Sequence, residues 1–503
     1  MSTLTPVRVA LAVPALLVSQ AAWADLTSAQ VWGDWKQYMQ GVGYTVTANE
    51  TVNGSDLTVS DIQMSLALPE NAGDMSMSMG TLNFVQNGPS VDVVMPDVMP
   101  VTINAIDGNN TFLMRFDYIQ SGQSMNASGT PTNSTYAYSA DTIKMSLVEL
   151  NADGQSFGPE NAKIDITGSG IKSTTSITLG DLRNYTQTGS FESMVYDVNI
   201  DNPEEPVKLQ MNGNINGISF DGSGAIPLVL DTADIAAMMK AGFAVSGQFN
   251  YASGATQMQA QDPNSGNFAM ETSSQGGSLG VVMNDKELGY NGEQNTVQIN
   301  VQAADLPFPI EMSMARSGFN LAMPLAASEE PQNFAFGVTM GDFVMSDLIW
   351  SIFDPTAQLP RDPATVELDL TGQAKMLVDI MDPEAMATAA APGELQALTL
   401  SKVLLSAAGA RLEGSGDFTF DNSDTTTFPG MPKPVGAINL ALAGGNGLMD
   451  KLVAMGLLPE EQAIGARLMM GLFAVPGEAP DTLNSKVEFT QDGQVLANGQ
   501  RIR

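Results

Sequence analysis

The side chains that most often carry acid–base or nucleophilic chemistry at neutral pH are missing from this sequence. Its 503 residues include no His and no Cys. This excludes Ser-His-Asp catalysis, thiolate nucleophiles, disulfides and the usual imidazole or thiolate metal sites. Adjacent glutamates at 204–205, 329–330 and 460–461 leave carboxylate-assisted hydrolysis as a formal alternative. Each pair lies beside a proline, which favours a loop or a helix start. We therefore expect that the protein is not an enzyme and binds no cofactor.

A tryptophan, two Asp-Pro steps and an arginine form the sharpest local feature. Trp350 and Phe353 precede Asp354-Pro355, and Arg361 precedes Asp362-Pro363. Proline restricts its own φ and favours extended geometry in the residue before it. The pattern predicts a structural corner in which Trp350 and Phe353 plug a sheet and Arg361 pairs with Asp354, Asp362 or a carbonyl. The alternative is a ligand clamp formed by Trp350 and Arg361.

Methionine is abundant, with 31 in the chain, and three lie at alternating positions, Met75, Met77 and Met79. Thioethers bind soft Cu(I), but flexible Met side chains also line apolar cores and grooves. We expect an apolar groove or core here and no metal site. The oxygen-rich segments 107–110 and 151–154 lack the spacing of an EF-hand and predict hairpin turns rather than calcium sites.

Strands must position most of these residues. Ile143, Met145 and Leu147 alternate with polar residues, and similar period-two runs recur along the chain. Turns with positive φ are predicted between the runs, at Asn53-Gly54, Asn87-Gly88, Asp107-Gly108, Asp153-Gly154 and Asp221-Gly222. Phase slips at Gly80 and at Ser60-Asp61 predict β-bulges. The sequence therefore predicts a mainly β protein with a long, curved, bulged antiparallel sheet.

Helices are predicted in three places. Thr27 and Gln30 fit a capping box for a short N-terminal helix that ends near Gly41 and covers the open end of a sheet. A mid-chain helix is predicted from Asp231 to about Gly242. A helical hairpin is predicted at about 446–474, and Pro459 opens its second helix. In that second helix Ile464, Leu468, Met469, Leu472 and Phe473 form the apolar face.

The first 24 residues have the pattern of a secretory signal peptide. Arg8 precedes the short apolar run 9–18, and Ala22-Trp23-Ala24 supplies small residues before a cleavage point after Ala24. The run is shorter than the roughly 20 residues that span a bilayer, although an uncleaved anchor is the alternative. We predict cleavage, a periplasmic location and no transmembrane segment in the mature chain. We divide that chain into β-rich regions at 25–242 and 243–503.

The chain is strongly acidic and poor in bases. It has 55 Asp and Glu against 21 Lys and Arg, a formal net charge of −34. Such a field repels phosphate, which argues against nucleic acid and against tight binding to anionic lipid surfaces. The acidity indicates a well-solvated surface rather than a site.

Four separated blocks resemble a Gram-negative periplasmic family known as the domain of unknown function 2125 family. The main block is MSDLIWSIFDPTAQLPRDPATVELDLTG at 345–372. The others are ADLTSAQVWGDWKQYMQGVGYTVT after the signal, AAGARLEGSGDF at 407–418, and GLLP at 456–459 with its closing QDGQV. The resemblance covers the mature chain in order, but the family has no established activity and implies no functional residues. Its strand-rich style is similar to AsmA-like envelope proteins, β-grooves associated with lipid handling.

These features lead us to expect a non-enzymatic envelope protein that binds an apolar or lipid-like ligand on a concave β face. The alternative is a periplasmic scaffold that docks another envelope protein and has no small-molecule ligand. An apolar face left open over several strands favours the first hypothesis, and a face sealed by the helices favours the second. The oligomeric state is left open by the sequence.

Overall fold

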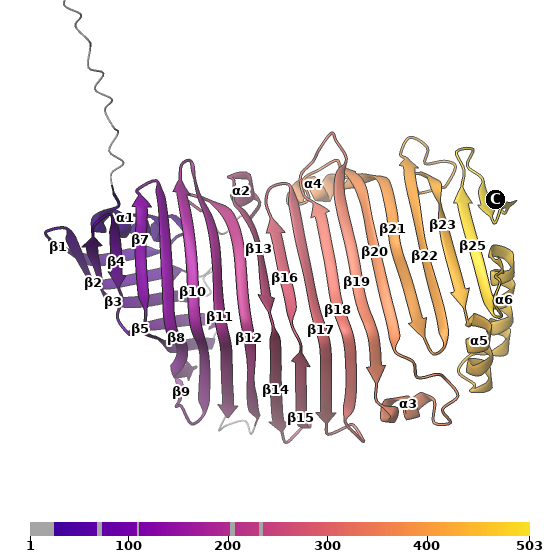
Figure 1. Ribbon diagram of the computed structural model, residues 1–503, viewed down its shortest axis with the longest axis horizontal. Helices are drawn as coiled ribbons and strands as arrows, with labels where there is room; N and C mark the ends of the chain where they lie inside the picture. Colours follow the sequence, from indigo (N-terminus) through magenta and orange to yellow (C-terminus); the bar gives the residue numbers. More distant parts are fainter. Residues whose placement is uncertain (1–24, 68–72, 108–109, 202–206, 231–234) are drawn as a thin grey trace, which may run out of the picture.

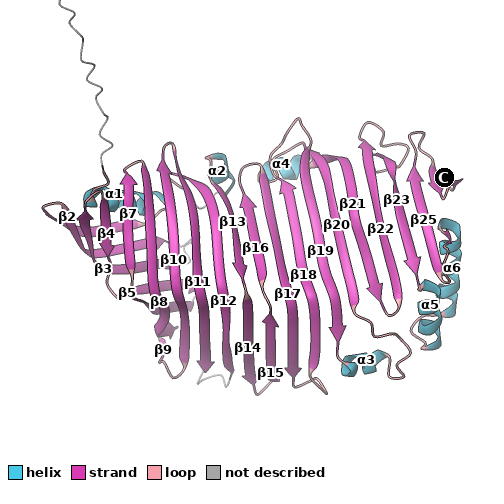
Figure 2. Ribbon diagram, viewed as in Figure 1, coloured by secondary structure: helices cyan, strands magenta, loops and turns pink. Residues whose placement is uncertain are grey.

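A single antiparallel sheet makes up most of the molecule, and its strands stand side by side along the long axis (Figures 1 and 2). The computed structural model describes residues 25–67, 73–107, 110–201, 207–230 and 235–503. The predicted signal peptide, Gly108 of one predicted turn, the 204–205 glutamates and the start of the mid-chain helix lie outside these residues. Within them the sheet has 27 strands. This confirms the mainly β fold class.

The first part of the sheet begins after the helix α1 (Ser28–Gly41). Its strands are β1 (Thr45–Asn53), β2 (Asp56–Ala67), β3 (Gly73–Asn87), β4 (Ser90–Val94), β5 (Val98–Asp107), β6 (Asn110–Ser121), β7 (Ser124–Thr130), β8 (Asn133–Ala152), β9 (Gln155–Phe157), β10 (Ala162–Leu179), β11 (Leu182–Asp201) and β12 (Lys208–Pro227).

The second part contains the other helices, α2 (Ile235–Lys240), α3 (Asp347–Phe353), α4 (Pro383–Thr388), α5 (Gly445–Ala454) and α6 (Glu460–Phe473). Its strands are β13 (Ala244–Tyr251), β14 (Ser253–Asp262), β15 (Gly266–Ser274), β16 (Gly277–Met283), β17 (Glu287–Ala303), β18 (Ile310–Pro324), β19 (Gln332–Met345), β20 (Ala364–Met376), β21 (Gly393–Ala407), β22 (Ala410–Asp421), β23 (Lys433–Ala443), β24 (Val475–Pro476), β25 (Thr482–Phe489), β26 (Val495–Ala497) and β27 (Gln500–Arg501).

One strand order occurs twice in the sheet. β4 and β5 lie end to end beside β3, and β7 and β6 lie end to end beside β8. In the same way β13 and β14 share β12, and β16 and β15 share β17. The units β3–β8 and β12–β17 are therefore topological copies. The sheet continues without interruption from β12 to β13, and the predicted division at residue 242 stays a prediction.

A line of backbone irregularities crosses the strands at mid-height. Residues with positive φ occur there in six different strands, at Asp61, Gly80, Gly170, Gly217, Thr296 and Asp342. Asp61 and Gly80 confirm the two predicted bulges, which lie beside each other because Ile62 pairs with Gly80. At each irregularity the apolar alternation changes phase, as from Met211 to Phe220 in β12. The slip keeps apolar side chains on the same face above and below the line.

Most of the predicted turns and helices are confirmed. Asn53-Gly54, Asn87-Gly88 and Asp153-Gly154 each join two strands. The prediction at Asp221-Gly222 is wrong, because both residues lie inside β12. Gly222 pairs with Gly247, and a Cβ on Gly222 would lie 3.1 Å from the Ser246 carbonyl oxygen. The glycine permits close strand packing there and does not form a turn.

The fully buried core lies at the N-terminal end, where α1 packs on β1, β2 and β3. Trp32 and Val31 of α1 are buried against strand residues such as Phe84. The Thr27–Gln30 capping box is present and begins the helix as predicted. The other helices lie at the margins of the sheet: α2 and α4 along one edge, α3 along the other, and α5 and α6 beside β25 (Figure 2).

Candidate functional site

Unbroken rows of apolar side chains cross the lower half of the sheet, below the line of irregularities. We call one the Met211 row, and its members are register partners on seven successive strands. They are Ile164, Val198, Met211, Met258, Met270, Val301 and Ile310. Strands lie about 4.8 Å apart, so the row is about 29 Å long. An apolar chain can contact one side chain after another along it.

A second row lies two residues further along each strand, on the same face. This Leu209 row is also apolar throughout and consists of Ala162, Ile200, Leu209, Ala260, Phe268 and Ala303. Alternate residues on a strand are about 6.6 Å apart, which makes a strip two side chains wide. Met258 and Met270 in its centre are half-buried.

The same face stays apolar above the line of irregularities. The Phe319 row consists of Phe220, Phe249, Leu279, Gly292, Phe319, Val338 and Leu368. Leu279 is 51% exposed and Phe319 is 48% exposed. Gly292 lies between these two residues, and Val338, which is 38% exposed, is the next register partner of Phe319. Large exposed apolar side chains so close together form a patch of the kind that marks an interaction surface.

No described helix makes an extensive contact with β10 to β20. α1 packs on β1 to β3, α5 packs on α6 and β22, and α6 packs on β25. On the apolar face of the central strands, Ile166, Leu279, Phe319 and Val338 are 38–51% exposed, so solvent reaches this face.

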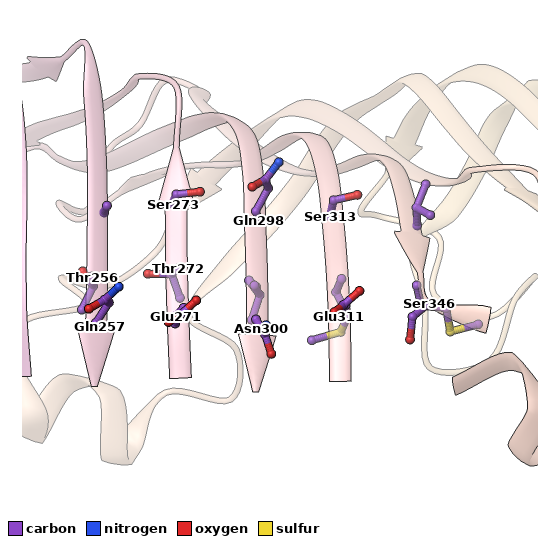
Figure 3. Close-up of a pocket in the computed structure, with 15 residues that line it drawn as sticks. Thr256, Gln257, Glu271, Thr272, Ser273, Gln298, Asn300, Glu311, Ser313 and Ser346 are labelled. Atoms are coloured by element: carbon purple, nitrogen blue, oxygen red, sulfur yellow. The ribbon is translucent and has the colours of Figure 1, made fainter. Parts of the chain in front are cut away.

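The opposite face carries a polar pocket of about 510 Å³ over β14, β15, β17, β18 and β19 (Figure 3). Gln257, Glu271, Asn300 and Glu311 are register partners there, and each is the sequence neighbour of a Met211-row residue. The two faces of these strands are thus sharply divided between polar and apolar. The lining of the pocket mixes these polar side chains with apolar residues such as Ala255 and Val344.

A second hollow, of about 610 Å³, contains a charge cluster near the line of irregularities. Glu367 accepts from Arg316 at 2.9 Å and also pairs with Lys402. The hydrogen bond from Lys402, aided by the Arg316 charge, lowers the pKa of Glu367. Because these charges satisfy one another, the cluster is a cross-strand brace.

The Trp350 corner forms around a buried carboxylate. Asp354 is fully buried and accepts from the backbone N–H groups of Gln358 and Leu359, at 2.8 and 2.9 Å. Burial alone raises the pKa of Asp354, but these bonds and the charges of Arg361 and Lys451 outweigh it and lower the pKa. Asp354 therefore holds the loop after α3.

Arg361 has a different partner from those predicted. It pairs with Asp347 at the start of α3, and its guanidinium lies 5.9 Å from the Trp350 ring centroid. The ring of Trp350 lies 5.1 Å from that of Phe353, which is 37% exposed. The four predicted corner residues thus come together at the sheet margin, in and after α3. This helix begins next to Ser346, whose backbone N–H donates to the carbonyl oxygen of Glu311, the neighbour of Ile310 at the end of the Met211 row.

The three alternating methionines of β3 share one face, as predicted. Met77 and Met79 pack against the N-terminal buried cluster, and Met75 pairs with Leu66 and Ile103. They continue the apolar face into the core. Within the described residues, no three Asp or Glu side chains gather closely enough to hold a metal ion.

Sequence reasoning missed one buried ion pair. Arg183 of β11 donates to both carboxylate oxygens of Asp34, at 2.5 and 2.9 Å, and lies 4.8 Å from the Tyr38 ring centroid. Tyr136 also donates to Asp34, at 3.2 Å. The pair borders a pocket of about 280 Å³. It anchors α1 to strands more than 100 residues away, which no local pattern reports.

The fold and its faces define a class of protein: a long antiparallel sheet with one open apolar face and helices at its margins. Among the described residues, no helix is both long and apolar enough to cross a membrane. The chain belongs to the family described as "Uncharacterized protein conserved in bacteria (DUF2125)", whose model matches residues 229–502. This confirms the family, while the resemblance over the N-terminal part stays a prediction. No curated protein and no solved structure matches the chain.

Proposed function

We propose that the protein binds the alkyl chain of a lipid-like ligand on its open apolar face, along the Met211 and Leu209 rows. The binding is non-catalytic. The observation that carries the proposal is the continuity of the Met211 row over seven strands with no polar interruption.

The dimensions of the strip support a lipid chain. A row of about 29 Å is close to the roughly 30 Å hydrocarbon thickness of a bilayer, about twice the length of one leaflet's chains. The strip can therefore accommodate a full acyl chain lying across the strands. Burying such a chain removes apolar surface from water on both partners, at roughly 25 cal/mol per Å².

The direct test is native mass spectrometry of the purified full chain, with organic extraction and lipid analysis of the same sample. We expect bound lipid in the wild type. Repeated absence of any extractable lipid, together with no binding of a fluorescent fatty acid, would contradict the proposal and favour the scaffold.

A matched pair of variants locates the site. Met258→Glu places a charge in the middle of the Met211 row, and Gln259→Glu places the same charge on the same strand but the opposite face. We expect Met258→Glu to weaken fatty-acid binding about 10-fold or more, because a carboxylate must be desolvated against the chain. Gln259→Glu is expected to bind like the wild type. Circular dichroism melting checks that both variants are folded.

The proposed place of action is the bacterial periplasm. This rests on the sequence pattern of residues 1–24 and on the bacterial distribution stated for the family. Mass measurement of the exported protein is expected to show a chain that begins at Asp25. Retention of the first 24 residues would point to the anchor alternative.

A further inference from the structure

The two ends of the sheet are built differently (Figure 1). At the C-terminal end, β25 is the last long strand, and two short strands cover its outer edge. β24 pairs with Leu483 and Asn484, and β26 pairs with residues 487–489. At the N-terminal end, β1 is nine residues long, and of the described strands only β2 pairs with it. The outer edge of β1 therefore has no strand partner in the described part of the chain.

The sequence of β1 lacks the features that normally protect an edge strand. Natural proteins prevent edge-to-edge pairing with proline, lysine, bulges or very short edge strands. β1 has the sequence TVTANETVN, without proline, lysine or glycine. None of its residues has a positive φ, and the nearby bulge belongs to the neighbouring strand, at Asp61. β1 is therefore a regular template for a further strand.

The hairpin between β1 and β2 fixes which backbone groups of β1 point outward. Asn53 pairs with Asp56 across the two-residue turn at 54–55, and such a closing pair exchanges both of its hydrogen bonds. The N–H and C=O groups of Asn53 thus point inward to β2. Because this direction alternates along a strand, every second residue from Val46 to Val52 presents its backbone groups to the open edge.

One register joins these outward groups to the same groups of a second copy. With Asn49 opposite the partner's Asn49, Val46 lies opposite the partner's Val52. Ala48 then lies opposite the partner's Glu50. Each of these contacts occurs twice, as a two-fold symmetric interface requires. Because all the paired residues point their backbone groups outward, each pair can exchange two hydrogen bonds.

The same register makes the side chains complementary. Thr47 lies opposite the partner's Thr51, and Thr–Thr pairs are favourable across antiparallel strands. Val46 belongs to the N-terminal buried cluster, whereas Val52 is 70% exposed in the single chain. The partner's Val52 extends that cluster beside Val46. Pairing of two β1 strands therefore covers an apolar side chain that one copy leaves in water.

Charge favours a second copy over a basic partner strand. Glu50 is the only charged residue of β1, and it accepts hydrogen bonds from Trp32 Nε1 at 2.8 Å and Lys36 Nζ at 3.0 Å. Its charge is thus compensated within the chain, and no like charges lie directly opposite each other in the symmetric register. An edge that recognised a basic strand would present free carboxylates. The remaining residues of β1 are uncharged, which suits pairing between two acidic copies.

We propose that two copies of the chain pair through β1, antiparallel and centred on Asn49, to form a symmetric dimer with one continuous sheet. Main-chain hydrogen bonds supply the affinity in this mode of strand addition, and the side-chain pairs supply the specificity. The contact lies at the end of the sheet and does not involve the Met211 row. The dimer and the alkyl-chain site can therefore each fail without the other.

The first test is sedimentation velocity of the purified full chain over a wide range of protein concentrations. We expect a reversible equilibrium between monomer and dimer, with the dimer dominant at high concentration. A wild type that stays monomeric at every concentration would overturn the proposal, even if β1 then captured a strand of another protein.

A disulfide reports the register, because the chain has no native cysteine. Asn49→Cys places two thiols in a non-hydrogen-bonded pair, whose Cα atoms are about 4.5 Å apart and within disulfide range. Thr51→Cys is the matched control, because its two copies are offset by four residues, about 14 Å along the strands. We expect mild oxidation to cross-link Asn49→Cys only. Equal cross-linking of both variants, or none of Asn49→Cys, would contradict the register.

Charged pairs test the contact by affinity. Thr47→Lys with Thr51→Lys places like charges opposite each other at both symmetric pairs, and we expect it to weaken dimerisation about 10-fold. This variant also lowers the net negative charge, so general repulsion cannot explain weaker pairing. Thr47→Glu with Thr51→Lys places opposite charges there and is expected to dimerise at least as well as the wild type. Equal dimerisation of the two variants, both folded by circular dichroism, would count against β1.

A variant of α6 separates this contact from the exposed apolar side chains at the other end of the sheet. Leu468 and Leu472 are 75% and 57% exposed. Leu468→Gln combined with Leu472→Gln is expected to dimerise like the wild type. If this variant abolished the dimer while the β1 variants kept it, the copies would meet through α6 and the proposed β1 contact would be wrong.

Discussion

At the residue scale, most of the few Lys and Arg side chains in the described part of the chain pair with a nearby carboxylate, while most carboxylates have no basic partner. The aspartates that are largely buried have structural roles. Asp354 holds a loop through two backbone N–H groups, and Asp34 holds α1 to the sheet through Arg183 and Tyr136. Breaking one side of a buried ion pair costs much more than the pair contributes, because a charge is left unpaired. These aspartates are therefore stability determinants rather than candidates for catalysis.

Tyr136 gives a pH-dependent signature of this anchor. Burial, and secondarily the Asp34 charge, raises the pKa of Tyr136 from its usual value of about 10 to about 12. The folded state holds the phenolic proton more tightly than the unfolded state, so the stabilisation is complete below pH 10 and is lost as the pH rises towards 12. We expect ionisation of Tyr136 to lower the free energy of unfolding by about 2–3 kcal/mol between pH 10 and pH 12.

Urea unfolding at several pH values checks this prediction, with Tyr136→Phe as the control. The variant lacks the titrating group and is expected to lose less stability than the wild type between pH 10 and 12. Identical slopes for the two proteins would show that Tyr136 titrates normally. Ultraviolet difference spectroscopy gives an independent measure of phenol ionisation.

At the element scale, the line of irregularities explains how strands of up to 20 residues keep one apolar face. Six strands have a residue with positive φ at this height, and their apolar alternation changes phase there. Gly217 is one such point in β12, with φ of 61°. A Cβ on it would lie 2.8 Å from the Ala252 side chain. Both its backbone conformation and its surroundings therefore require glycine.

Gly217→Ala is expected to destabilise the protein by at least about 1–2 kcal/mol, the cost of left-handed backbone geometry for a residue with a Cβ. The contact with Ala252 adds to this cost. Thermal or urea unfolding measures the effect. Gly54→Ala is a control that isolates the backbone term, because its φ is 65° and its Cβ meets open space. An equal loss of stability in Gly217→Ala and Gly54→Ala would mean that the contact with Ala252 is removed by a small movement that costs no measurable free energy.

At the scale of the whole molecule, charge and apolar surface are segregated. The net charge of the chain is −34, while the apolar rows of the sheet contain no charged side chain. With no His and no Cys, hardly any side chain titrates near neutrality. The charge stays almost constant from about pH 6 to 9, so any control of ligand binding must come from contacts rather than from protonation.

Self-repulsion of this charge makes stability depend on salt. Raising ionic strength from about 0.01 M to about 0.15 M shortens the Debye length from about 30 Å to about 8 Å. We expect the melting temperature to rise by a few degrees over this range, because repulsion among the excess acids falls more than the surface ion pairs weaken. Differential scanning calorimetry measures the shift, and a fall in melting temperature would contradict the explanation.

The sequence by itself determined the fold class, the N-terminal capping box, the C-terminal helical hairpin, the bulges at Asp61 and Gly80, and the family resemblance. These depend on local patterns: period-two alternation, Asn-Gly turns, caps and phase slips. A local pattern also shows that the four corner residues near Trp350 lie close together, although it named the wrong acidic partners for Arg361.

The tertiary structure alone decided which strands are neighbours, and hence whether apolar residues join into rows. Alternation of apolar and polar residues along a strand predicts which face of the sheet a residue occupies. It does not predict which residue of a neighbouring strand, 40 or 60 positions away in the sequence, lies beside it. Beside β3 and beside β12, two short strands lie end to end in place of one long strand. A prediction in which each strand pairs only with the next one in the sequence would therefore give the wrong register. Likewise, the pattern of α6 reveals an apolar side but not its direction. In the structure Ile464, Leu468 and Leu472 on that side are exposed, and the helix is held by the hydrogen bonds of Arg467 with Asn446 and of Ser485 with the Phe473 carbonyl.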